Sequence, residues 1–79
     1  MIYIFAANAN QAHGYARFKG LAPHDYRPIF EDGRHTLRGV CHPEVILAGS
    51  WQSRSRQELN TMQALVQALG GTIVEDNSW

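Results

Sequence analysis

The apolar run at residues 45–48, Val-Ile-Leu-Ala, is the feature that most limits how this chain can fold, because no polar residue interrupts it. Such a run needs cover on both faces, which is typical of a central strand in a parallel sheet with helices on both sides. Gly49 ends the run, and the polar residues 50–55 predict a loop. Ser55 and Glu58 have the spacing of a capping box before a run with helical periodicity. Strand, loop and helix therefore follow one another, as in half of a βαβ unit.

The rest of the chain predicts a further helix and three further strands. Residues 2–6 are β-branched and aromatic, which favours a strand. Asn8 and Gly20 are typical ends for a helix over 9–19, in which the central Gly14 costs about 1 kcal/mol relative to alanine. Residues 26–30 predict an edge strand, because Pro28 lacks an amide donor, and residues 35–40 predict a single helical turn. The helix after the central loop covers 56–69 and ends at two glycines, and residues 72–75 predict a last strand.

The order β-α-β-(turn)-β-α-β predicts a small Rossmann-like α/β domain. We expect a mostly parallel four-stranded sheet in the order 2-1-3-4, with helices on both faces. The 79 residues make a single domain, residues 1–79. A domain of this size buries only about 60% of its unfolded surface, so it is marginally stable unless it oligomerises. A second copy of the chain is therefore one partner that the sequence allows. Tyr3 and Trp79 either form the interface of such a homodimer or only complete a small core.

The charges balance overall but are unevenly distributed. Seven basic residues match seven acidic ones, which argues against a general nucleic-acid coat or a polybasic membrane anchor. Between residues 34 and 56, however, four arginines face Glu44 alone, so we expect an electrically two-sided molecule. Cys41 is the single cysteine, which excludes an intramolecular disulfide and favours a reducing cytoplasm. The apolar start lacks a basic leader and is too short to span a membrane, so no membrane partner is expected.

Neither catalysis nor metal binding has a sequence signature. Cys41 and His42 are adjacent, but neighbours in sequence rarely face each other and no third orienting group is evident, so an ordinary loop pair is the better interpretation. The four histidines match no compact zinc pattern. We therefore expect no enzyme activity, no catalytic residue, no metal and no cofactor.

The loop from Gly49 to Arg56 is the best candidate for a binding site. Ligands and partners of open α/β sheets usually meet the loops at the carboxyl ends of the strands. Tryptophan and arginine dominate protein-binding hot spots, and this loop carries Trp51, Arg54 and Arg56. The alternative for Trp51 is packing, half-buried, over the carboxyl end of the sheet. With the nearby turn, the candidate binding residues are Ser50, Trp51, Arg54, Arg56, Arg34 and Arg38.

Two other functions use the same region. A small ligand or a nucleotide phosphate could bind the amino terminus of the helix after the loop, although the glycine patterns of nucleotide-binding loops are missing. Nucleic acid could bind the arginine-rich face, but the neutral total charge makes that function the weakest of the three.

Several stretches together resemble small uncharacterised α/β proteins encoded by phages of actinobacteria. They are the opening MIYIFAANANQAHGYARFKGLAPHDYR, then TLRG, then VILAGSWQSR, followed by an amphipathic helix. The resemblance implies a protein made in the cytoplasm of the bacterial host that acts by binding a host protein and sometimes harms host growth. It also implies that Arg38 and Gly39 either contribute to the binding face or merely end the helical turn.

Overall fold

The computed structural model describes every residue from 1 to 79 and confirms the predicted α/β fold. Four parallel strands form one sheet in the order β2-β1-β3-β4, as predicted. The strands and helices are β1 (Ile2–Phe5), α1 (Ala9–Phe18), β2 (Tyr26–Pro28), β3 (Glu44–Ala48), the short 3₁₀ helix η1 (Trp51–Ser53), α2 (Arg56–Ala68) and β4 (Thr72–Asp76).

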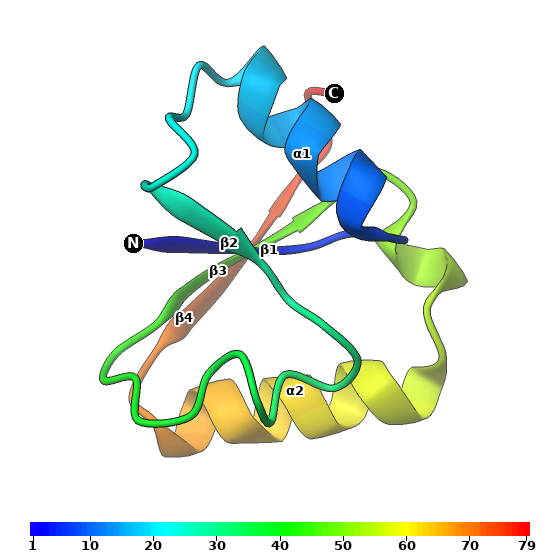
Figure 1. Cartoon of the computed structure of the whole chain (residues 1–79). Helices are drawn as coiled ribbons and strands as arrows, with labels where there is room; N and C mark the ends of the chain where they lie inside the picture. The colour runs from blue at the N-terminus through cyan, green and yellow to red at the C-terminus, as the bar shows by residue number, and fades with distance from the viewer.

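The two long helices cover opposite faces of the sheet (Figure 1). On the α2 side, alternate side chains of β1 and β3 pack with the buried stripe of α2 in a cluster of Tyr3, Phe5, Ile29, Leu37, Val45, Leu47, Met62 and Val66. On the α1 side, the other residues of the same strands meet small side chains of the helix in a cluster of Ile4, Ala6, Ala12, Tyr15, Ala16 and Ala48. Both faces of β3 are therefore covered at its carboxyl end, as its unbroken apolar run predicts.

Side-chain caps define where both helices begin. The Asn8 side chain accepts a hydrogen bond from the Gln11 amide at 2.8 Å, and Ser55 Oγ accepts one from the Glu58 amide at 3.1 Å. Only half of the predicted capping box forms, because the Glu58 carboxylate pairs with Arg54 at 3.4 Å. That pairing is the first sign that Arg54 faces inward.

The connection between β2 and β3 contains the predicted helical turn but no regular helix. Residues 31–39 form a series of turns, and no helix is present between β2 and β3. The Leu37 amide bonds the Gly33 carbonyl at 2.9 Å, and the Leu37 side chain is buried against the core on the α2 side. Burial of this one leucine holds the connection against the sheet without a regular helix.

The carboxyl-terminal Trp79 explains why α1 contains a glycine. A Cβ atom at Gly14 would lie 3.0 Å from Trp79 Cζ2, so the indole packs where any other residue would project. The same ring meets Tyr15 edge-on, with ring centroids 6.2 Å apart. Tyr3 is buried under α2. Of the two predicted roles for Tyr3, a dimer interface or the core, the structure shows the core. Neither α1 nor α2 has the length and apolar composition of a membrane-spanning helix.

Candidate binding surface at the carboxyl end of the sheet

The loops that follow β1 and β3 lie side by side and are joined by one side chain. Gln11 Oε1 accepts hydrogen bonds from the Ala7 amide at 3.2 Å and from the Ser50 amide at 2.8 Å. The carboxyl ends of neighbouring parallel strands meet at the same edge of a sheet, which is where open α/β folds bind their ligands. In this protein a glutamine of α1 already bonds the backbone amides at that point.

The crevice between these loops is filled by the protein itself. Gly49 has a φ of +58°, and a Cβ atom there would lie 2.5 Å from Gln11 Oε1 and 2.9 Å from Trp79 Cζ3. Dinucleotide-binding folds need this space for a pyrophosphate against the backbone. Gln11 and Trp79 occupy it here.

Arg54 is a structural residue of the same edge. Its side chain is only 11% exposed, and its guanidinium carbon lies 4.2 Å from the centre of the Phe5 ring. Every guanidinium nitrogen has a partner in the chain. The carboxylate of Glu58 lies 3.4 Å from Nε, and the backbone carbonyls that accept from the two terminal nitrogens belong to Ala6 at 2.7 Å, Ile29 at 3.5 Å and Glu31.

The position of Arg54 changes its predicted role. We expected Arg54 to be a surface cation beside Trp51. Its guanidinium instead connects the carboxyl end of β1, the segment after β2 and the start of α2. An arginine suits this place because its planar fork offers five donors in fixed directions. Substituting Arg54 therefore disturbs the fold, and it gives no clean test of binding.

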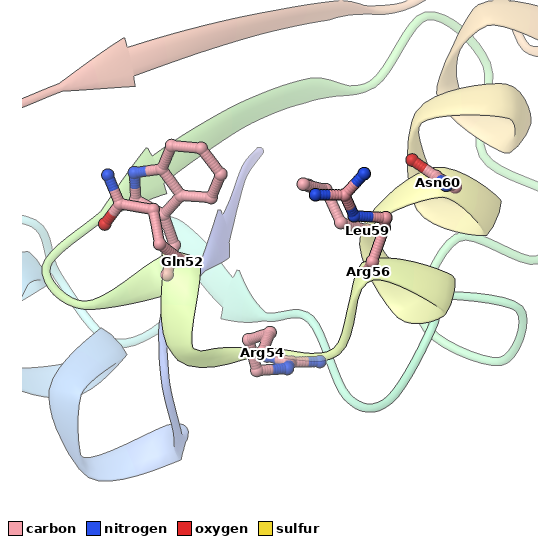
Figure 2. A pocket seen from close by; sticks show the side chains of 6 residues that line it. Gln52, Arg54, Arg56, Leu59 and Asn60 are labelled. Atoms are coloured by element: carbon pink, nitrogen blue, oxygen red, sulfur yellow. The ribbon is translucent and has the colours of Figure 1, made fainter.

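An open pocket of about 450 Å³ lies between η1 and the first turns of α2. Figure 2 shows Arg56, Leu59 and Asn60 of α2 facing Gln52 across this pocket, with Arg54 on the loop that joins the two sides. Arg56 is exposed and has no acidic partner within salt-bridge distance. Its charge is therefore available to a molecule in the pocket.

Trp51 forms part of the wall of this pocket and is half-buried. Its ring packs against the core cluster on the α2 side, so packing accounts for part of its role. The indole Nε1 is buried and has no hydrogen-bond partner. Leaving a buried donor unpaired costs about 1 to 3 kcal/mol, and Trp51 Nε1 is the one buried side-chain polar atom of this kind in the protein.

The other predicted binding residues, Arg34, Arg38 and Ser50, do not line the pocket. Arg34 pairs with Asp32 at 2.9 Å, and Arg38 is exposed; neither lines the pocket. Ser50 is exposed and contributes its backbone amide to Gln11. The structure thus groups Trp51 and Arg56 but does not bring Arg34 and Arg38 to them.

Acidic side chains surround the amino terminus of α2 on its other side. A hollow of about 210 Å³ there is lined by Glu31, Asp32 and Glu58 together with Ser55 and Gln57. Asp32 and Glu58 are paired with Arg34 and Arg54, so the carboxylate that offsets the attraction of the helix amides for a phosphate is that of Glu31.

Cys41, His42 and His13 lie outside the pocket beside Trp51. Cys41 is exposed, while His42 Nδ1 lies 3.0 Å from the Gly70 carbonyl and holds the start of β3 beside the end of α2. His13 Nδ1 lies 2.5 Å from the Tyr26 hydroxyl. No three histidine, cysteine or acidic side chains converge as metal ligands would.

A network at the end of β4 holds the two titratable groups whose pKa values are shifted. The Tyr15 hydroxyl donates to Asp76 Oδ2 at 2.5 Å, and Lys19 Nζ lies 3.1 Å from the same oxygen. The Ser78 hydroxyl, then the Tyr15 hydroxyl, the Ser78 amide and Lys19 hold the pKa of Asp76 well below its usual value. Burial, followed by the bond to Asp76, raises the pKa of Tyr15.

Sequence reasoning missed Gln11, Tyr15 and Asp76 as linked residues of this edge. Gln11 and Ser50 are 39 positions apart, and Tyr15 and Asp76 are 61 positions apart, so no local pattern connects them. Comparison of the chain with protein-family models, curated proteins and solved structures finds no match.

Proposed function

We propose that the protein is a non-catalytic interaction module that binds another protein at the pocket beside Trp51. The observation that carries this proposal is an open pocket with an indole and a leucine in its wall and a free arginine, Arg56, at its rim. Aromatic and arginine side chains around a pocket are typical anchors of protein interfaces. The amides of Gln52 and Asn60 add donors and acceptors at the rim.

The chemistry of the pocket favours a partner segment with an apolar side chain next to an acidic one. The apolar side chain would contact Trp51 and Leu59, and the carboxylate would pair with Arg56.

The two alternative functions have less support from the arrangement of charges. A phosphate at the start of α2 would meet the carboxylate of Glu31, which has no ion-pair partner, while Asp32 and Glu58 are already paired with Arg34 and Arg54. Nucleic-acid binding needs several free cations on one face. Arg54 is enclosed by the fold and Arg34 is paired with Asp32, so the predicted arginine-rich face is divided.

The host-directed role, as a phage product that binds a protein of its bacterial host, is part of the same proposal. It rests on the sequence resemblance described above. The pocket supports it only by offering a site of suitable chemistry.

The test is capture of a partner from an actinobacterial lysate by tagged protein, with identification by mass spectrometry. The informative variant is Arg56→Glu, because Arg56 is exposed and makes no contact that the fold needs. We expect one host protein that the unchanged chain captures and that Arg56→Glu loses.

The matched control is Arg27→Glu, which makes the same charge change at an exposed arginine of the edge strand β2. Capture should survive in this control. Equal capture by a folded Arg56→Glu variant, or equal loss in both variants, would contradict the proposed site.

A further inference from the structure

The two edges of the sheet differ in their capacity to accept another strand. β2 is the first edge, and the Ile29 amide just after it bonds the Ile4 carbonyl at 2.8 Å. Backbone groups alternate in direction along a strand, so Tyr26 and Pro28 point outward. Pro28 has no amide hydrogen, which leaves this edge with one outward donor and blocks it.

β4 is the opposite edge and has no such protection. Its five residues include neither proline nor lysine, and it pairs with β3 alone. The Thr72 amide bonds the Pro43 carbonyl at 2.9 Å, so the backbone groups of Thr72, Val74 and Asp76 point toward β3. Those of Ile73 and Glu75 point outward, with both donors and both acceptors free.

The sheet face beside this edge is also uncovered. α1 packs on β1 and β2 and reaches β3 and β4 only at their carboxyl ends, so Val74 in the middle of β4 is 59% exposed on that face. A hollow of about 390 Å³ extends from Val74 across β3 to the half-buried Ile46. An exposed β-branched residue on an open edge is a template for pairing.

We propose that two copies of this chain associate through β4, with the strands antiparallel about a two-fold axis at Val74. Outward residues must oppose outward residues, so Ile73 pairs with Glu75 of the other copy through both of their free backbone groups. Val74 then meets its own copy in a non-hydrogen-bonded pair, where side chains are closest. The two sheets join into one, and each Val74 gains an apolar neighbour.

The length and the charges of β4 favour this register, because a centre at Val74 pairs all five residues of the strand. Shifting the strands so that Glu75 faces its own copy places like charges directly opposite, which is unfavourable. In the register centred on Val74, Glu75 faces Ile73, and Asp76, already paired with Lys19, faces Thr72. Because β2 is blocked, pairing at β4 closes as a dimer and does not continue into a fibre.

Five paired residues make a small interface, so the dimer dissociates on dilution. Stable protein interfaces bury more than about 1,000 Å², and smaller ones are transient. Sedimentation velocity over a range of concentrations is therefore the appropriate measurement. We expect the unchanged chain to shift from monomer to dimer as its concentration rises.

Two charge variants test the contact at the axis. Val74→Lys and Val74→Glu each place like charges opposite one another and should stay monomeric alone, whereas an equimolar mixture of the two should form dimers. Phe30→Lys is the matched control, because Phe30 is 68% exposed and lies outside β4, and it should dimerise normally. A monomer at every concentration, or a dimer that Val74→Lys leaves intact, overturns the proposal.

Cross-linking tests the register separately. With Cys41 replaced by serine, Val74→Cys puts two thiols on Cα atoms about 4.5 Å apart, within the range of about 4.4 to 6.8 Å that a disulfide needs. Thr72→Cys is the control, since Thr72 and its copy lie about 13 Å apart along the strands. Oxidation should link Val74→Cys only. Equal linking of both variants, or of neither, overturns the register.

Discussion

The carboxyl end of the sheet and its β4 edge differ in whether their backbone groups have hydrogen-bond partners within the chain. At the carboxyl end, side chains from distant segments satisfy the loop backbone: Gln11 bonds two amides, and Arg54 bonds three carbonyls. Along β4, the outer backbone groups have no partner, and Val74 is exposed beside them. The first region is closed by the chain, and the second is open.

The difference separates what holds this domain together from what it offers to other molecules. The loops that occupy the position of a nucleotide crevice are joined to each other by partly buried and exposed polar contacts of Gln11 and Arg54. The surfaces available for binding lie beside these contacts, at the Trp51 pocket and at the β4 edge. Substitutions at the closed end should therefore alter stability, and substitutions at the open surfaces should alter association.

The largest expected effect is at Arg54. Arg54→Ala leaves the carbonyls of Ala6, Ile29 and Glu31 without their donor and should lower the free energy of unfolding by about 3 kcal/mol. Urea denaturation measures this loss. Arg56→Ala, two residues away but exposed, should change stability by less than about 0.5 kcal/mol. Equal effects of the two substitutions would remove the distinction between a closed end and an open pocket.

A smaller effect is expected at the contact between Gly14 and Trp79. Alanine favours a helix over glycine by about 1 kcal/mol, but its Cβ would meet the indole at 3.0 Å. Gly14→Ala should therefore stabilise the Trp79→Ala chain by about 1 kcal/mol and the unchanged chain by clearly less. Thermal or urea unfolding of the four variants gives the coupling. An identical gain in both backgrounds would mean that Trp79 does not restrict this position.

The smallest effect is confined to the ends of the pH range. The folded pKa of Asp76 lies below the usual 3.8, so its contribution to stability is full above that value and is lost as the pH falls through the folded pKa. The raised pKa of Tyr15 has the opposite sign: its contribution is full below pH 10.0 and is lost as the pH rises further. Asp76→Asn should flatten the acid decline of the urea midpoint between about pH 5 and pH 2. A decline as steep as that of the unchanged chain would contradict this role of Asp76.

The candidate site was predictable in place but not in detail. The loop after the buried strand was identified because strand ends and loop composition are local features, and the structure places the Trp51 pocket there. The orientation of Arg54 was not predictable, because its partners lie 48, 25 and 23 residues earlier in the chain. A sequence shows that an arginine is present but not whether its guanidinium meets water or three carbonyls.

The sequence by itself determined the succession of strands and helices and narrowed the strand order to a few, of which the preferred one is observed. An unbroken apolar run requires two covered faces, Pro28 requires an edge, and caps and glycines mark the ends of both helices, so these local rules leave few topologies for so short a chain. Only the tertiary structure decided which side chains close the carboxyl end and which backbone remains open. Those outcomes depend on contacts between distant residues, such as Gln11 with Ser50 and Trp79 with Gly14, whose energies arise only when the chain has folded.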